Sequence, residues 1–506
     1  MGHHTNNAKA TRASLAGDPH RPRYHFLPPA NWMNDPNGPI QWRGTYHLFY
    51  QHNPDAPHWG TMHWGHTASR DLVHWDDLPI ALTPTPGSPD EAGCFSGCAV
   101  DDGGTPTLIY TGVRGQRPFT QQQCLAVSHD GLLTWEKDPA NPIIAAPPPG
   151  VAATDFRDPC VWREEDGWYM VLGASLGGQA GAVLLYRSPD LRHWEYLGVP
   201  YTRSRQEHEP LPTGWMWECP QFFPLGDRHV LIVSAMLEGR PNHVACFVGR
   251  YEGHRFTPER VERLDLGPDY YAPITFQDER GRRLMWGWSW EGRSPEAQRA
   301  AGWAGVMALP RVLTLRPDGA LGIEPAPEIA MLRRAQKAWP LCSEGFSPSH
   351  SAGASASPGP GQAAQATTTW VDLQGDCLEI LAEFEPDVAA TRFGLRVRCS
   401  PGAEEETLIY YDRPSSRLVL DRERASLDPA AHRGRHGGPL RLSAGEPLRL
   451  HVFLDRSIVE VYANGRVSLT ARIYPTRPDS LGLGPLAWGG SARLRSLRVW
   501  ELASIW

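Results

Sequence analysis

Three acidic residues in this sequence occupy closely matching places in a repeated pattern. Asp35 and Asp158 each lie nine residues before a turn glycine, and Glu218 lies eight residues before another. Carboxylates that are brought together repel one another, so one can stay ionised while another holds a proton near neutral pH. Hydrolysis of a glycosidic bond uses such a pair, because one group attacks while the other protonates the leaving oxygen. The three acids are therefore candidates for glycoside chemistry.

The turn glycines belong to a repeat of about 60 residues. They are Gly44, Gly103, Gly167, Gly226 and Gly281. A second marker, a serine followed by a turn and a tryptophan, starts at Ser69, Ser128 and Ser188, which are 59 and 60 residues apart. Units of this length, with several short strands and hardly any helical periodicity, are typical of β-propeller blades. We therefore predict an all-β protein in which residues 24–330 form a five-bladed β-propeller.

The propeller explains why the matching places matter. The first strand of every blade lines the central axis, so equivalent positions meet at one end of the channel. The three carboxylates would then face a common pocket. The second repeat contributes Phe95 and Ser96 at this position, and the fifth contributes Tyr271. An asymmetric pocket of acids, hydroxyls and an aromatic ring is typical of a sugar site.

The remaining segments predict a second domain. Residues 1–23 are expected to be disordered, and residues 331–368 to form a linker with a short helix and a low-complexity loop rich in Ser, Gly, Ala and Pro. Residues 369–506 contain alternating apolar and polar runs, with Asn464 and Gly465 as a hairpin turn. This pattern favours an antiparallel β-sandwich.

Composition narrows the possible partners. Lys and Arg number 49 against 56 Asp and Glu, so the net charge of -7 argues against nucleic acid or an anionic membrane as a partner. No apolar run reaches the roughly 20 residues of a membrane span, and the first twenty residues lack the apolar run of a secretory signal. We expect a cytoplasmic protein, unless a signal has been removed.

Cysteine and histidine give no sign of a metal or cofactor. The nine cysteines are scattered, and no second pair or histidine cluster completes a site around Cys94 and Cys98, so buried reduced thiols are expected. The histidines between residues 52 and 66 have no spacing that places them on one helical face. No cofactor and no metal are therefore predicted.

The motifs around the three acids resemble those of glycoside hydrolase family 32, which contains invertases, inulinases and levanases. They are Trp32-Met33-Asn34-Asp35-Pro36-Asn37-Gly38, Arg157-Asp158-Pro159 and Glu218-Cys219. The resemblance implies a five-bladed propeller followed by a β-sandwich, and a retaining mechanism that removes terminal fructosyl units. It also implies that Asp35 is the nucleophile, that Glu218 is the general acid and base, and that Asp158 stabilises the transition state.

The same resemblance implies a set of residues that contact the sugar. They are Asn34, Gln51, Trp59, Phe95, Ser96, Arg157 and Trp290. The sequence departs from the family pattern at Cys98, where serine is more usual, and at Gln221, where aspartate is frequent. Both positions are expected beside the pocket, so they bear on the leaving group more than on the chemistry.

The leading functional hypothesis is a β-fructofuranosidase that acts on sucrose and short fructo-oligosaccharides. An exo-acting inulinase or levanase, or a fructosyltransferase, would keep the same site. Sucrose 6-phosphate ranks lower, because no distinctive cationic cluster is visible for its phosphate. A non-catalytic carbohydrate-binding propeller is the alternative from another class, and would be expected to lack one of the acids. A homo-oligomer formed through the sandwich is a further hypothesis.

Overall fold

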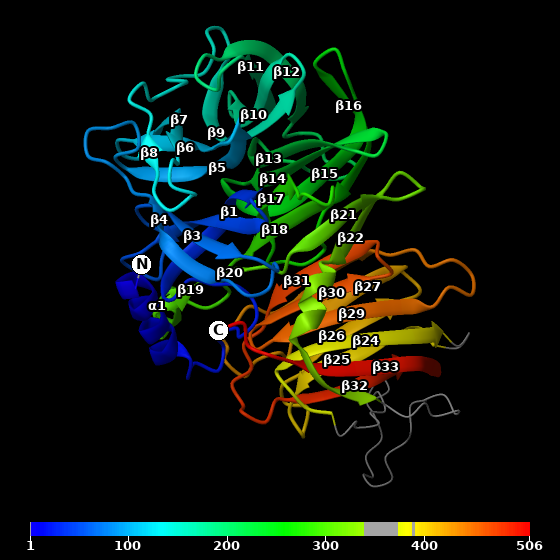
Figure 1. The fold of residues 1–506 in the computed structure, drawn as a ribbon. Helices are drawn as coiled ribbons and strands as arrows, with labels where there is room; N and C mark the ends of the chain where they lie inside the picture. Colours follow the sequence, from blue (N-terminus) through cyan, green and yellow to red (C-terminus); the bar gives the residue numbers. More distant parts are fainter. Residues whose placement is uncertain (1, 339–372, 387–389) are drawn as a thin grey trace, which may run out of the picture.

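The computed structural model describes residues 2–338, 373–386 and 390–506, and most of its regular structure is β-strand (Figure 1). The N-terminal part, blue to green in Figure 1, consists of small sheets set around a centre, and the C-terminal part, yellow to red, lies below it. None of the helices in the described ranges is long and apolar enough to cross a membrane.

The N-terminal part contains five sheets within the described residues. Blade one is β1 (Asn31–Trp42), β2 (Thr45–Asn53), β3 (His63–Ser69) and β4 (Asp76–Leu82). Blade two is β5 (Gly93–Asp102), β6 (Thr105–Arg114), β7 (Thr120–Val127) and β8 (Glu136–Lys137). Blade three is β9 (Ala153–Glu164), β10 (Gly167–Leu176), β11 (Ala180–Ser188) and β12 (Glu195–Ser204).

Blades four and five complete the ring. Blade four is β13 (Met216–Leu225), β14 (Arg228–Leu237), β15 (Arg240–Glu252) and β16 (Arg255–Arg263). Blade five is β17 (Tyr271–Gln277), β18 (Arg283–Ser289), β21 (Arg311–Leu315) and β22 (Leu321–Pro325), with β20 (Val306–Met307) on β18. The short helix α2 (Pro295–Ala301) precedes β19 (Trp303–Ala304), which pairs parallel to β1.

The five inner strands form a closed ring. β1 contacts β5, β5 contacts β9, β9 contacts β13, β13 contacts β17, and β17 contacts β1. The ring is fastened where β19, from the chain that follows blade five, joins the sheet of blade one. The predicted five-bladed propeller is confirmed, and the inner strand of each blade lies next to the inner strands of two other blades around the axis.

The C-terminal part is a sandwich of two antiparallel sheets in the described residues. One contains β23 (Arg333–Ala338), β33 (Ala492–Leu502), β24 (Cys377–Pro386), β29 (Leu448–Asp455), β30 (Ile458–Ala463) and β31 (Val467–Arg472). The other contains β28 (Arg435–Pro439), β27 (Arg417–Asp421), β26 (Thr407–Asp412), β25 (Arg392–Cys399) and β32 (Gly482–Trp488). Between β30 and β31, Asn464 (φ 52°) and Gly465 (φ 61°) both adopt the left-handed conformation that a tight hairpin requires.

Two predicted boundaries need correction. Where residues 1–23 were expected to be disordered, the structure has helix α1 (Gly2–Leu15). The helix has no apolar stripe to reveal it in the sequence, and it is held by Arg12, which pairs with Asp77 of β4 at 2.7 Å and lies over the Trp506 ring. The expected short helix is present as the 3₁₀ helix η1 (Pro327–Leu332). The strand that follows it, β23, pairs with β33 of the sandwich, so the sandwich domain begins well before residue 369. The low-complexity loop lies outside the described residues.

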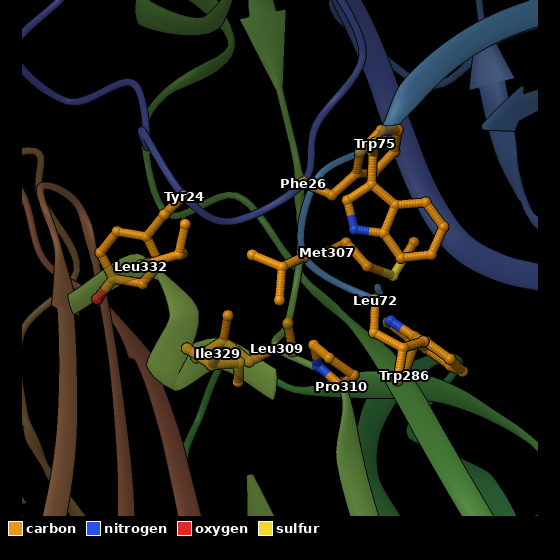
Figure 2. A pocket seen from close by; sticks show the side chains of 12 residues that line it. Tyr24, Phe26, Leu72, Trp75, Trp286, Met307, Leu309, Pro310, Ile329 and Leu332 are labelled. Carbon is orange, nitrogen blue, oxygen red and sulfur yellow. The ribbon is translucent and has the colours of Figure 1, made fainter. Parts of the chain in front are cut away.

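Apolar side chains of the two domains pack against one another. Figure 2 shows an apolar pocket in this region, with Trp75, Trp286 and Met307 near one another and with Ile329 and Leu332 contributed by η1. None of the residues that line it is acidic, so it is not a candidate catalytic pocket.

The eight cysteines that the structure describes form no disulfide. Seven of them are buried, and Cys160 is half-buried. Within the described part of the chain, this arrangement agrees with the thiols expected from the sequence.

Candidate active site

Every inner strand is irregular at the same level of the propeller. The antiparallel register of each shifts there, between Met33 and Pro36 in β1, Phe95 and Gly97 in β5, Arg157 and Cys160 in β9, Glu218 and Gln221 in β13, and Tyr271 and Ile274 in β17. Bulges of this kind bend a strand and redirect its side chains, and they are frequent beside active sites. In a regular strand, neighbouring side chains would point to opposite faces of the sheet. The five bulges turn consecutive side chains of the inner strands toward the central axis.

The backbone at three of these bulges is left-handed. Asp158 (φ 63°), Cys219 (φ 46°) and Ala272 (φ 48°) adopt this conformation, which is uncommon for residues other than glycine. Their shared geometry makes Asp158 equivalent to Cys219, so Glu218 occupies the position of Arg157. The spacing to the glycines does not show this offset, because Gly167 is the first residue of β10 whereas Gly226 lies inside its turn, two residues before β14 begins.

Asp35 lies on β1 and accepts two well-placed hydrogen bonds. Ser96 Oγ of β5 donates to its Oδ2 at 2.7 Å, and Asn34 Nδ2 donates to its Oδ1 at 3.1 Å. Burial raises the pKa of Asp35 to about 6; the Ser96 hydrogen bond opposes the shift and the negative charge of Glu218 adds to it. At neutral pH the carboxylate is therefore mostly ionised.

Asp158 is held from the neighbouring blade. The backbone N–H of Cys219 donates to its Oδ2 at 2.9 Å, and the Asp158 N–H donates to Thr111 Oγ1 at 2.9 Å. The Cys219 sulfur is 3.6 Å from Oδ2 of Asp158 and 3.6 Å from Oδ2 of Asp35, so the two carboxylates flank one sulfur atom. Burial raises the pKa of Asp158 to about 7; Arg157 opposes this shift and Glu218 contributes to it.

Glu218 has a different partner on each oxygen. Arg157 Nη2 donates to its Oε1 at 2.9 Å, and the Tyr271 hydroxyl donates to its Oε2 at 2.8 Å. The Arg157 guanidinium also pairs with Asp155 at 2.6 Å and lies 3.9 Å from Asp158. Burial works against the charge of Arg157, but these carboxylates outweigh it and raise its pKa. One permanent cation is thus shared among the acids.

An aromatic wall connects Glu218 with Asp35. The Trp290 ring stacks on the ring of Tyr271 at a centroid distance of 5.5 Å, and it meets Trp288 edge to face at 6.0 Å. Trp288 in turn lies 5.7 Å from Trp32. The Trp32 indole N–H donates at 2.7 Å to Asn34 Oδ1, and Asn34 donates to Asp35. Rings of this size present flat faces against which a sugar ring can pack.

The rim of the site carries a second aromatic group. Trp59, one of the few large exposed hydrophobic residues, is 38% exposed, and its ring lies 6.2 Å from the ring of Phe95, next to Ser96. Phe95 also meets Phe119 at 5.8 Å. The Arg117 guanidinium lies 4.3 Å above the Trp59 ring, a cation–π arrangement. The rim can therefore offer an apolar face and a positive charge to a group that leaves the pocket.

The other predicted positions have packing roles. Gln51 is 2% exposed and donates through Nε2 to the Cys94 carbonyl, behind the strand of Asp35. Cys98 packs in the apolar core between blades two and three. Gln221 accepts a hydrogen bond from the Thr275 N–H at 2.7 Å, so it ties blade four to blade five. These contacts give Cys98 and Gln221 structural roles, and the expectation that they bear on the leaving group stays a prediction.

The sequence reasoning missed part of the wall. Trp32 and Trp288 were not singled out, although the alternation Trp286-Gly287-Trp288-Ser289-Trp290 in the sequence predicts that Trp288 lies on the same side of the chain as Trp290. Asp269, which accepts a 2.9 Å hydrogen bond from the Trp290 indole N–H, lies in an irregular segment before β17 and has no recognisable pattern.

Two family models together cover most of the chain. The model described as the glycosyl hydrolases family 32 N-terminal domain matches residues 25–325, and the model described as the family 32 C terminal matches residues 348–501. The chain belongs to glycosyl hydrolase family 32. The earlier resemblance is confirmed, and this family 32 chain is a glycoside hydrolase that acts on fructosides.

Similar proteins span nearly the whole chain. A sucrose-6-phosphate hydrolase of Zymomonas mobilis is 39% identical over 95% of this chain and 92% of its own length. A raffinose invertase of Escherichia coli is 37% identical over 95% of each. The solved structure of fructan 1-exohydrolase IIa from Cichorium intybus has a TM-score of 0.83 and 26% identity, and the match covers 96% of this chain and 98% of that one.

Proposed function

We propose that this family 32 enzyme releases terminal β-D-fructofuranosyl units from sucrose and short fructo-oligosaccharides by a retaining double displacement. The observation that carries the proposal is the meeting of three carboxylates from three inner strands, each with different partners. The non-catalytic alternative predicts a missing acid, and Asp35, Asp158 and Glu218 are all in place.

Asp35 is assigned the role of nucleophile. It is ionised at neutral pH, and the donors Ser96 and Asn34 fix the direction of its two oxygens. Attack on the fructosyl C2 forms a bond from one carboxylate oxygen to carbon, while the bond from C2 to the leaving oxygen breaks. Water later attacks C2 and releases fructose with its original configuration.

Glu218 is assigned the role of general acid and base. Burial gives Asp35 and Asp158 raised pKa values, so the coupled cluster keeps a proton close to neutral pH. Glu218 would pass a proton to the leaving oxygen and later accept one from water. The hydrogen bonds from Arg157 and Tyr271 hold its carboxyl group in one orientation during both steps.

Asp158 is assigned the stabilisation of the transition state. Its carboxylate is fixed by the Cys219 N–H and flanks the same sulfur atom as Asp35. A fixed carboxylate next to the reacting carbon can accept hydrogen bonds from ring hydroxyls and stabilise the positive charge of an oxocarbenium-like transition state. No covalent bond to Asp158 is expected.

The aromatic surfaces supply sites for the sugars. Trp290 and the wall next to it would pack against the fructosyl unit, and Trp59 with Phe95 would contact the leaving sugar. Sucrose 6-phosphate is a second candidate substrate, because Arg117 places a guanidinium at this rim and relatives at 36 to 39% identity carry the name sucrose-6-phosphate hydrolase.

The first experiment measures sugar release from sucrose, sucrose 6-phosphate, 1-kestose, inulin and levan by chromatography. Fructose release from sucrose or its 6-phosphate that disappears in Asp35→Asn supports the proposal, and a faster reaction on long polymers would move it to an exo-inulinase or levanase. Transfer to methanol tests the stereochemistry, since retention gives the β-methyl fructofuranoside. Full activity of Asp35→Asn would contradict the nucleophile assignment.

Two further expectations stay predictions. A cytoplasmic location is tested by fractionation of cells that express the chain with its own flanking sequence. Assembly through the sandwich is tested by light scattering on the purified protein, where a monomer at working concentration would contradict it.

A further inference from the structure

We propose that Asp269 is a positioning residue for Glu218, and that Arg422 of the sandwich keeps Asp269 in place. The sandwich would then set the geometry of proton transfer in the propeller. This proposal rests on the proposed function, because it takes Glu218 to be the group that protonates the leaving oxygen. It gives the second domain a part in catalysis beyond covering one side of the propeller.

The first link runs from Glu218 to Trp290. The Tyr271 hydroxyl donates to Glu218 Oε2 at 2.8 Å, and the Tyr271 ring is stacked on Trp290 with an interplanar angle of 26°. Tyr271 is 2% exposed, so its position depends on the groups packed against it. A displaced Trp290 ring would leave one face of Tyr271 unsupported, next to the carboxyl group that must donate a proton.

The second link fixes Trp290. Its indole N–H donates to Asp269 Oδ1 at 2.9 Å, and its carbonyl accepts a hydrogen bond from Arg472 Nη1 at 3.4 Å. Trp290 follows the last residue of β18 and belongs to no strand, so backbone pairing within a sheet does not hold it. Side chains at both ends of the residue therefore determine where the ring lies.

The third link belongs to the sandwich. The other oxygen of Asp269, Oδ2, accepts from Arg422 Nη1 at 2.5 Å and from the Arg472 N–H at 2.7 Å. Arg422 follows β27, and Arg472 ends β31. Asp269 is 1% exposed and Arg422 is 3% exposed, so water does not screen the ion pair.

The backbone shows that this contact is built into the fold. Asp265 forms a parallel bridge with Ser468 of β31, and the Asp269 N–H donates to the Thr470 carbonyl at 3.3 Å. The segment that leads into β17 therefore runs along the edge strand of the sandwich. Asp265 and Asp269 both lie in this segment, but in the described structure only Asp269 bonds to a tryptophan of the catalytic wall.

The test compares Asp269→Asn with Asp265→Asn. Asp269 accepts hydrogen bonds from Trp290 on one oxygen and from Arg422 and Arg472 on the other. An asparagine has only one oxygen, so it must lose the hydrogen bonds on one of these two sides. At residue 265 the same change disturbs Arg311, Ser468 and Thr470, all away from the wall. Both variants are measured with sucrose and with p-nitrophenyl β-D-fructofuranoside, whose leaving group needs little protonation.

The positioning role has a selective kinetic signature. Asp269→Asn should lower kcat on sucrose about tenfold or more, and should change kcat on the nitrophenyl substrate less than about threefold. Asp265→Asn should lower the unfolding temperature but keep both rates per folded molecule. An equal loss on both substrates in Asp269→Asn would overturn the proposal.

A double-mutant cycle with Trp290→Phe tests the route. Phenylalanine keeps a ring but lacks the indole N–H, so adding Asp269→Asn should cost no further activity on sucrose. Additive losses would show that Asp269 acts by another path. Arg422→Gln is measured in parallel in case Asp269→Asn does not fold, and Arg422→Lys, which keeps the positive charge, should recover part of the rate.

Glu218→Gln on the same two substrates separates this proposal from the proposed function. If this variant slows both substrates equally, the acid assignment fails, and the positioning role fails with it. If Glu218→Gln is selective for sucrose but Asp269→Asn is not, only the positioning role is overturned.

Discussion

Two clusters of acids that are buried or partly buried have opposite pKa shifts. In the propeller channel, Asp35 and Asp158 have pKa values raised to about 6 and about 7. At the contact between the domains, Glu460 has a pKa lowered to about 2, and that of Asp455 is also lowered. Burial pushes all four upward, so the partners of each acid decide the outcome.

The partners differ in number and in charge. In the channel, Arg157 is the cation shared by Asp155, Asp158 and Glu218. At the domain contact, Glu460 lies between Arg311 at 2.9 Å and His25 at 3.2 Å. Asp455 accepts three backbone N–H bonds from residues 23–25 and one from the His25 ring. The channel acids have fewer donors and cations around them, so their pKa values are raised and they can bind a proton near neutral pH. The acids at the domain contact have more, so they stay ionised and form ion pairs between the domains.

The largest expected effect is on the reaction itself, in Glu218→Gln. Glutamine can accept from Arg157 through its oxygen and donate its amide N–H to the Tyr271 hydroxyl, but it cannot give up a proton. The rate on sucrose should fall by about 10²- to 10⁴-fold, and that on a nitrophenyl fructoside much less. Steady-state kinetics on purified protein measures both, and a thermal midpoint within a few degrees of wild type shows that folding is intact.

The domain contact is tested by Glu460→Gln, which removes a charge that two cations share. Arg311 and His25 then lose a buried partner, and the free energy of unfolding should fall by about 3 kcal/mol. Urea unfolding at pH 7 measures the loss. Glu259→Gln on β16 is the matched control, because its partners Arg228 and Arg250 are at the surface and its midpoint should stay unchanged. Equal effects would contradict the comparison.

The two clusters also differ in how far the sequence predicts them. The three candidate catalytic acids could be predicted because the repeat places Asp35, Asp158 and Glu218 before turn glycines, and equivalent positions of a propeller lie close together around its axis. The bulges put Glu218 in the Arg157 position, which its spacing to the turn glycine does not show. Repeats thus predict both the fold and the members of a site that lies on the symmetry axis.

The domain contact has no such regularity. Asp269, Arg311 and Arg422 come from a loop, the start of β21 and the end of β27, and no spacing relates them. Their meeting depends on how the propeller docks on the sandwich, which is a property of two whole surfaces. Helix α1 was missed for a related reason, because Arg12 anchors it to residues far away in the sequence.

Asp158→Asn is expected to raise the free energy of unfolding, whereas Glu460→Gln lowers it, and the change should be smaller. Because the folded pKa of Asp158 lies above the unfolded value, its contribution to stability is lost as pH rises from about 4 through 7. An amide removes this charge, so the variant should be inactive but more stable at pH 8, by about 1 to 2 kcal/mol. Urea midpoints at pH 8 and pH 5 measure the gain, which should shrink at the lower pH. A loss of stability at pH 8 would show that Asp158 supports the fold.

The smallest expected effect is on the pH dependence of stability, which should differ between variants of two buried histidines, His25 and His66. Burial lowers the pKa of both, but hydrogen bonds to Asp455 and Glu460 overcome it for His25 and raise its pKa, whereas His66, beside His47, keeps a strongly lowered one. A raised pKa contributes stability that is full below about 6.5 and is lost as pH rises through the folded value. His25→Gln should therefore cost about 1 kcal/mol more at pH 6 than at pH 9 in urea unfolding. His66→Gln should instead cost less at pH 6 than at pH 9, because at pH 6 the unfolded chain binds a proton that buried His66 does not. A smaller cost at pH 6 for His25→Gln as well would mean that its ring is neutral between the two acids.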